Sequence, residues 1–100
     1  MRNPITQVRK WFALHGTKRS DKWPEVRAAH LKTEGWCRYC GGSLDLEVHH
    51  IHPFHLVPAQ ELDPANLITL CERMGIECHL HAGHLGNWKN FNPAVRQQAT

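Results

Sequence analysis

Four cysteines in two pairs are the residues of this chain whose types and spacing most directly indicate metal binding. Cys37 and Cys40 are separated by two residues, and Cys71 and Cys78 are separated by six. Four thiolates satisfy the tetrahedral coordination of zinc, and such a shell leaves no position for water. The cysteines therefore predict a structural zinc site. The alternatives are two disulfides, or Cys78 as an ordinary buried thiol.

Histidines form a second group, in L-E-V-H-H-I-H-P-F-H at 46–55 and C-H-L-H-A-G-H at 78–84. A neutral imidazole binds divalent cations, and an imidazole with a pKa near about 6.5 can take a proton from water. Neighbouring residues of a strand point to opposite faces. His49 and His50 can therefore share one site only if the strand bends or ends there, which Pro53 favours.

The second histidine segment is predicted to be helical, and the helical spacing bears on which imidazoles can meet. Residues three or four apart lie on one face of an α-helix. This spacing pairs His81 with His84, whereas His79 and His84 are five apart. His79 would join His84 only if Gly83 or a helix end distorts the segment.

The elements that must position these side chains can be read from the pattern of apolar residues. A helix is predicted over 23–34, with Pro24 in its first turn and Gly35 after its end. Alternating apolar residues predict a strand over 44–49, and the run L-I-T-L-C predicts a second strand over 67–71. Antiparallel pairing of the two is the simplest topology. A loop over 54–63 and a helix over about 77–86 complete an α+β fold, and a short helix is possible within 5–12.

Length and composition narrow the class of protein. One hundred residues predict a single domain whose small core needs a metal or disulfides for stability. The first twelve residues interrupt every apolar run with charge, which argues against a secretory signal, and no run has the roughly 20 apolar residues of a membrane span. We therefore expect a cytoplasmic protein with reduced thiols and no membrane partner.

Positive charge is concentrated at the start of the chain. Residues 1–38 hold nine of the twelve Lys and Arg residues but three of the nine acidic residues. Basic segments bind polyanions, most commonly nucleic acid. The candidate DNA-binding residues are Lys18, Arg19, Lys22, Arg38 and Lys89.

These motifs together resemble the HNH endonuclease family. The resemblance rests on C-x-x-C, L-E-V-H-H-I-H-P, D-P-A-N-L-I-T-L-C and C-H-x4-H in that order, over roughly residues 36–85. It implies an α+β fold, the small ββα-metal or His-Me finger, stabilised here by a structural zinc. The expected organisation is a basic N-terminal helical extension at 1–35, the nuclease core at 36–92 and a C-terminal tail at 93–100.

The resemblance also implies roles for individual residues. His49 matches a metal ligand and His50 the general base, while Asn66 matches the central Asn that holds the loop and so aims the base. His79 matches the ligand from the helix, and His84 a second metal-binding His found in some members. The spacing between Cys71 and Cys78 exceeds the family's pattern, so the choice between His79 and His84 stays open.

The reaction implied by the resemblance is hydrolysis of DNA with one divalent metal ion, giving 5′-phosphate and 3′-hydroxyl ends. Imidazole ligands favour Mn²⁺, Co²⁺, Ni²⁺ or Zn²⁺, while water and phosphate oxygens still accommodate Mg²⁺. The alternative is a non-catalytic zinc-finger module that binds DNA. Small HNH chains resemble phage, mobile-element and restriction nucleases alike. The sequence does not distinguish monomer from dimer, or nicking from double-strand cleavage.

Overall fold

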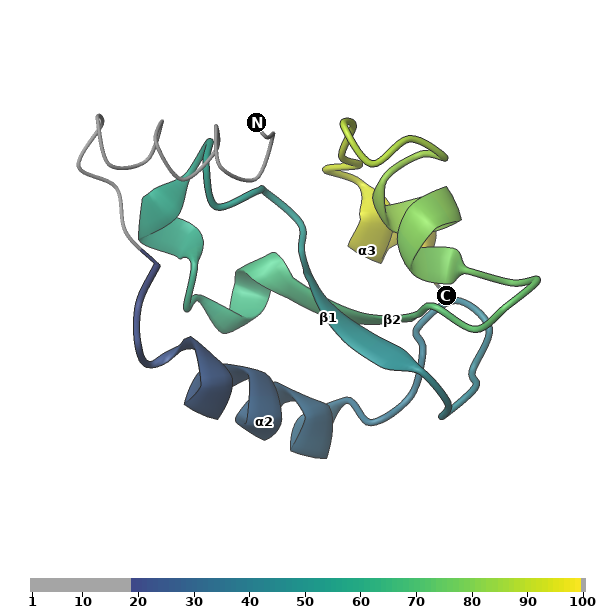
Figure 1. The fold of residues 1–100 in the computed structure, drawn as a ribbon, viewed down its shortest axis with the longest axis horizontal. Helices are drawn as coiled ribbons and strands as arrows, with labels where there is room; N and C mark the ends of the chain where they lie inside the picture. Colours follow the sequence, from purple (N-terminus) through teal and green to yellow (C-terminus); the bar gives the residue numbers. More distant parts are fainter. Residues whose placement is uncertain (1–18, 100) are drawn as a thin grey trace.

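A two-stranded antiparallel sheet lies at the centre of the computed structural model, which describes residues 19–99 (Figure 1). The described elements follow the order α2 (Trp23–Thr33), β1 (Leu46–His50), η1 (Pro58–Gln60), η2 (Pro64–Asn66), β2 (Leu67–Cys71), the π-helix η3 (His79–Gly83) and α3 (Val95–Gln98). This is the predicted α+β fold. The short helix suggested within 5–12 lies outside the described residues.

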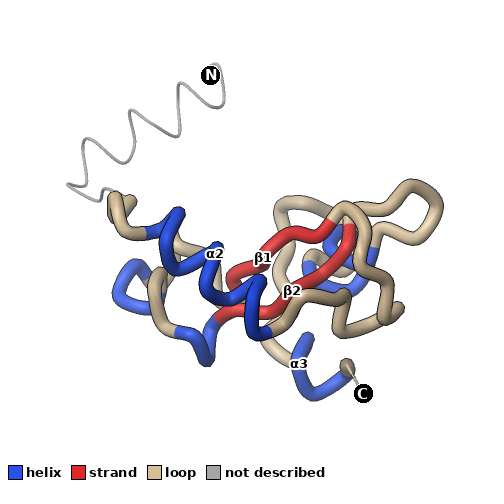
Figure 2. Tube along the Cα trace, turned by 90° about the horizontal axis from the view of Figure 1, so that it is seen from below, coloured by secondary structure: helices blue, strands red, loops and turns tan. Residues whose placement is uncertain are grey.

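The sheet confirms the predicted strands and their antiparallel pairing. Leu46 lies opposite Cys71, and His50 lies opposite Leu67. The first strand begins at Leu46 rather than at the predicted Leu44, whose side chain is exposed. All five residues of β2 are buried. They are covered because α2 contacts one side of the sheet and η3 the other, as Figures 1 and 2 show.

The carboxyl end of α2 is fixed to the sheet through one buried carboxylate. Glu34 Oε1 accepts a hydrogen bond from the Thr69 amide at 2.9 Å, and the Glu34 carbonyl accepts one from Thr69 Oγ1 at 2.7 Å. Arg96 of the α3 segment donates to both carboxylate oxygens and to the Leu67 carbonyl. Burial alone would raise the pKa of Glu34, but the bonds from Thr69 and Arg96 lower it below its usual value. An ionised Glu34 therefore holds α2, β2 and the α3 segment together.

The buried core is small and includes cysteines. It consists of Cys37, Ile51, Ile68, Leu70, Cys71, Cys78, Val95 and Ala99. Tyr39 packs against this cluster and donates a hydrogen bond to the Val95 carbonyl at 2.8 Å, which fixes α3 beside the C-x-x-C turn. The core and the thiol cluster are thus one continuous region. Among the described residues, no helix is long and apolar enough to cross a membrane.

Candidate functional site

The four cysteine thiols converge at one point. Cys37 and Cys40 lie on the turn after α2, Cys71 ends β2 and Cys78 directly precedes η3. Their sulfurs all lie within 4.8 Å of one another, and all four thiols are free. Cys40 Sγ and Cys71 Sγ are 3.6 Å apart. A disulfide needs about 2.05 Å, whereas a tetrahedral zinc with bonds of about 2.3 Å holds its sulfurs about 3.8 Å apart. The geometry therefore suits a structural zinc.

Backbone amides around these sulfurs favour the thiolate form that binds metal. The amides of Tyr39 and Cys40 donate to Cys37 Sγ at 3.4 and 3.5 Å. Gly41, with a φ of 79°, allows the tight turn that brings these amides around the sulfur. Burial would raise the pKa of Cys71, but hydrogen bonds from the Cys78 and Arg73 amides and from the Cys40 and Cys78 thiols outweigh it and lower this pKa to about 7. Burial and the neighbouring thiols raise the pKa of Cys78, and they raise that of Cys40 despite a hydrogen bond with the Gly42 backbone, so of these three thiols only Cys71 has a lowered pKa.

Three imidazoles form a second cluster, which lines a cleft beside η3. His49 of β1 meets His79 and His84, and one ring nitrogen of each lies within 4.8 Å of the other two. His79 Nε2 is 3.0 Å from His49 Nδ1 and 3.3 Å from His84 Nε2. The structure therefore brings together both helix histidines between which the sequence leaves the choice open.

The π-helix explains how residues five apart share a site. The His84 amide donates to the His79 carbonyl at 3.2 Å, which is the i to i+5 bond of a π-turn. This turn places residues i and i+5 side by side, where an α-helix would align i and i+3 or i+4. His81, which α-helical spacing pairs with His84, is exposed and lies outside the cluster.

Hydrogen bonds on the far side of two rings fix which nitrogen faces the cluster. His79 Nδ1 lies 2.9 Å from Glu72 Oε2, and His84 Nδ1 lies 2.7 Å from the Asn90 carbonyl. An ionised carboxylate and a carbonyl only accept, so each Nδ1 carries the proton and each Nε2 carries a lone pair. Two lone pairs facing each other at 3.3 Å repel unless a cation lies between them. The donor set therefore fits a divalent metal ion.

His49 is held neutral and close to the π-helix. Burial is the largest cause, and together with the neighbouring imidazoles of His79, His84 and His50 it lowers the pKa of His49 to about 3. A neutral imidazole is the form that binds metal. Gly83 makes this approach possible, because a Cβ at that position would lie 2.9 Å from Leu70 Cδ1 and 3.2 Å from His49 Nε2.

His50 lies beside this cluster but in a different environment. Its Nε2 is 2.9 Å from the Glu61 carbonyl, so Nε2 carries the proton and Nδ1 is the basic atom. The indole of Trp23 packs on the ring, with centroids 4.4 Å apart. Burial, and after it the positive charge of Arg19, lowers the pKa of His50 despite the opposing effect of the Glu61 carbonyl. Since β1 ends at His50, both neighbouring histidines line one cleft of about 370 Å³.

Asn66 connects the end of β1 with the loop that follows it. Its Oδ1 accepts from the His52 amide at 2.7 Å, and its Nδ2 donates to the carbonyls of His52 and Gln60 at 3.0 and 3.2 Å. The side chain is buried, so each of these bonds is shielded from water. Because Gln60 precedes Glu61, Asn66 also restrains the segment whose carbonyl binds His50.

Comparison with models of known protein families gives a match that covers this site. The model of the HNH endonuclease family matches residues 37–85. This segment belongs to the HNH endonuclease family. It includes both clusters, together with His50 and Asn66. No curated protein and no solved structure matches the chain at a significant level.

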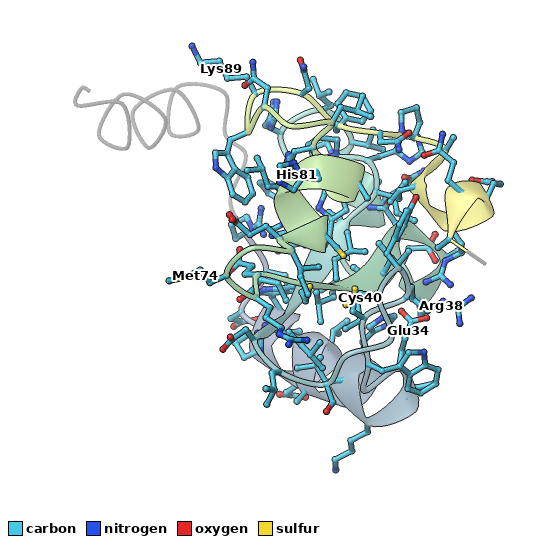
Figure 3. All side chains as sticks on the ribbon, turned by 90° about the vertical axis from the view of Figure 1, so that its right-hand side faces the viewer. Glu34, Arg38, Cys40, Met74, His81 and Lys89 are labelled. Atoms are coloured by element: carbon cyan, nitrogen blue, oxygen red, sulfur yellow. The ribbon has the colours of Figure 1, made fainter. Side chains whose placement is uncertain are left out.

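The candidate DNA-binding residues that the structure describes lie in different surroundings. Arg19 and Lys89 line the cleft, and Arg19 pairs with Glu61 at 3.2 Å. Lys22 is exposed at the start of α2, and Lys18 lies outside the described residues. Arg38 pairs with Glu34 at 3.4 Å and lines a different hollow; Figure 3 shows this pair well away from Lys89.

Several residues of the site carry no signal in the sequence. Glu72 and Asn90 orient two ligands, and Glu61 orients His50, but each acts from a loop, through a contact with a residue seven, six and eleven positions away respectively. Trp88 lies over the cluster, with its ring centroid 5.1 Å from that of His79 and 4.8 Å from that of His84, and it is 55% exposed. A weak clue is that Glu72 and His79 each directly follow a cysteine of the thiol cluster.

Proposed function

We propose that this protein is a metal-dependent HNH endonuclease that hydrolyses DNA phosphodiester bonds. The observation that supports this most strongly is one cleft that holds three convergent imidazoles and, beside them, a fourth whose free Nδ1 is basic. A site that only bound metal would not need this fourth imidazole.

In this proposal His49, His79 and His84 hold a single divalent ion. When bound, the ion would polarise the scissile phosphate and neutralise charge on the leaving oxygen. Three nitrogen donors favour Mn²⁺, Co²⁺, Ni²⁺ or Zn²⁺, and oxygens from water and phosphate would accommodate Mg²⁺. The four cysteines hold a structural zinc that takes no part in the reaction.

The chain's own contribution to the chemistry is the movement of one proton. His50 Nδ1 accepts a proton from a water molecule, whose oxygen then bonds to phosphorus. The bond from phosphorus to the 3′ oxygen breaks, and that oxygen takes a proton from solvent. The products are a 5′-phosphate and a 3′-hydroxyl. Asn66 and the Glu61 carbonyl keep the ring of His50 directed at the water.

The proposed substrate contact is electrostatic. Lys89 and Arg19 at the cleft, with the basic residues of the first third of the chain, would neutralise phosphates. Affinity that depends on phosphate contacts falls steeply with salt concentration and carries little sequence preference.

Plasmid nicking with and without Mn²⁺ or Mg²⁺ tests the proposal. We expect His50→Ala to reduce the rate constant by about 10² to 10⁴-fold, the usual contribution of a general base. His81→Ala, on the exposed side of the same π-helix, is the matched control and should retain activity. Wild-type activity that survives in His50→Ala would exclude His50 as the base. A wild-type protein that binds DNA but cleaves none with any of these ions would support the non-catalytic module instead.

A further inference from the structure

Residues that precede the HNH segment contact the proposed base in two ways. Trp23, the first residue of α2, packs its indole on the His50 ring with a centroid distance of 4.4 Å and an interplanar angle of 38°. Arg19 Nε pairs with Glu61 Oε2 at 3.2 Å, and the Ser20 amide donates to Glu61 Oε1 at 3.0 Å. Glu61 in turn provides the carbonyl that accepts from His50 Nε2.

The base needs such support because its own strand does not fix its side chain. His50 is the last residue of β1, so the ring can rotate about two side-chain torsions. The carbonyl that selects its tautomer belongs to a loop between η1 and η2, outside the sheet. Two contacts hold this loop: Asn66 binds Gln60, and Arg19 with Ser20 binds the buried carboxylate of Glu61.

The contacts at the amino end of α2 are not explained by core packing. None of the residues of α2 is buried, and the helix is fixed at its other end by Glu34 and Thr69. The side chain of Arg19 is half exposed and also lies over the Phe54 ring at 4.4 Å. The described contacts at this end of the helix are therefore made with residues in or beside the cleft: His50, Phe54 and Glu61.

We propose that Arg19, Ser20 and Trp23 form a positioning segment for the general base, so that the N-terminal part of the chain completes the active site. This inference rests on the proposed function, because it assigns a role toward the base named there. Trp23 would restrict rotation of the His50 ring, and Arg19 with Ser20 would hold the Glu61 carbonyl against its Nε2 proton. For Arg19 this positioning role is separate from the contact with DNA phosphates proposed above.

Single-turnover nicking at saturating DNA and Mn²⁺ tests this inference. For Trp23→Ala we expect a rate constant lower by about tenfold, a part of what a general base contributes. The dissociation constants for DNA and for Mn²⁺ should stay within about twofold, since the loss concerns the proton-transfer step. Trp23→Phe keeps an aromatic face and should retain most of the rate.

Two variants provide matched controls. Trp36→Ala removes a second tryptophan that lines a different hollow, and Glu25→Gln removes an exposed charge from the first turn of α2. Both should keep the wild-type rate constant. If Trp36→Ala and Trp23→Ala lower the rate constant equally, the loss reflects general destabilisation of the fold, and the inference is overturned.

Nitrogen-15 NMR of the histidine rings gives a second measurement that does not depend on cleavage. With zinc in the thiol site and no other ion, wild-type His50 should show only the tautomer protonated at Nε2. Arg19→Gln and Trp23→Ala should give a mixture of the two tautomers. If Trp23→Ala does not fold, as judged by circular dichroism, Arg19→Gln and Trp23→Phe decide the question.

The two proposals fail in different ways. If the wild type cleaves no DNA, the nuclease function is wrong and the NMR result still decides whether this segment positions His50. If the wild type cleaves DNA, but Trp23→Ala and Arg19→Gln keep both the rate constant and the single tautomer, the positioning role is wrong and the nuclease function stands.

Discussion

Three of the four imidazoles that line the cleft donate their ring proton to an oxygen that can only accept, whereas Nε2 of the fourth, His49, has no hydrogen-bond partner within the described part of the chain. These pairs are His50 with the Glu61 carbonyl, His79 with Glu72 and His84 with the Asn90 carbonyl. The acceptors fix the tautomers before any ion or substrate binds. A ligand already in the required tautomer and orientation loses less freedom on binding, and hydrogen bonds of this kind raise its basicity.

Glu72 provides the sharpest test at the scale of the residue. Its carboxylate lies 2.9 Å from His79 Nδ1 and is partly exposed, so its removal should disturb the fold little. We expect Glu72→Ala to weaken binding of Mn²⁺ or Co²⁺ by about 10 to 100-fold, as for other residues that orient metal ligands. Glu72→Gln keeps an acceptor oxygen but not the charge, so its loss should be smaller. Calorimetric titration of the zinc-containing protein measures both.

Glu77→Gln is the control for this experiment, because it removes the same charge from the same loop. It should leave the affinity for the ion near that of the wild type. If Glu77→Gln and Glu72→Gln weaken binding equally, the effect is general electrostatic attraction of the cation and not orientation of His79.

The sequence predicts the metal-binding and catalytic candidates far better than the residues that orient them. His49, His50 and Asn66 stand in motifs of fixed spacing, and each has a chemical property that the proposed reaction requires. Glu72 and Asn90 are polar residues of loops, a kind that is usually solvated. Their roles depend on how two loops pack around η3, which no local pattern encodes.

At the scale of the element, the π-helix is the feature that sequence periodicity could not supply. The predicted helix over 77–86 has the right place, but the regular structure is a single π-turn at His79–Gly83. An α-helical reading favours His81 with His84, whereas the structure uses His79 with His84. One residue more per turn changes which side chains meet, and π-turns of this kind are frequent at functional sites.

Gly83 is the position where this element meets the sheet most closely. An added Cβ would lie 2.9 Å from Leu70 Cδ1 and 3.2 Å from the His49 ring, so Gly83→Ala must displace one or both. We expect His49 to move away from His79 and His84, and the affinity of the histidine cluster for a divalent ion to fall by at least about tenfold. Titration with Co²⁺ followed by its visible absorption measures this loss.

The control is another glycine-to-alanine change, at a position without a close neighbour. A Cβ at Gly42 would have its nearest contact at 3.5 Å, an ordinary distance, and this residue lies by the thiol cluster. Gly42→Ala should keep the wild-type affinity of the histidine cluster. An unchanged affinity in Gly83→Ala as well would mean that η3 relaxes away from the sheet at no cost to the site.

At the scale of the whole molecule, the thiol cluster and the histidine cluster are directly connected. Glu72 follows Cys71 and His79 follows Cys78, so each cluster fixes the backbone of the other. The two-stranded sheet and the general α+β fold follow from apolar alternation and from Pro and Gly positions. The packing of α3 through Val95 and Arg96 cannot be predicted from such patterns. It depends on hydrogen bonds from Arg96 to a carbonyl of β2 and to the buried carboxylate of Glu34.

Loss of the structural zinc should therefore affect both stability and the second metal site. Cys40 is the one exposed cysteine of the four, so Cys40→Ser removes a ligand with little change to the core. We expect the zinc content to fall from about one ion per chain, and the melting temperature to fall with it, because binding free energy at a structural zinc is folding free energy. The affinity of His79 and its partners for Mn²⁺ should fall as well, since Cys78 no longer fixes the start of η3.

Metal analysis, thermal denaturation and Mn²⁺ titration measure these effects, with the exposed Ser43→Ala as the control from the same loop. A Cys40→Ser protein with unchanged zinc content would exclude the four-thiolate site, and one that loses zinc but keeps its affinity for Mn²⁺ would show that the two clusters are independent.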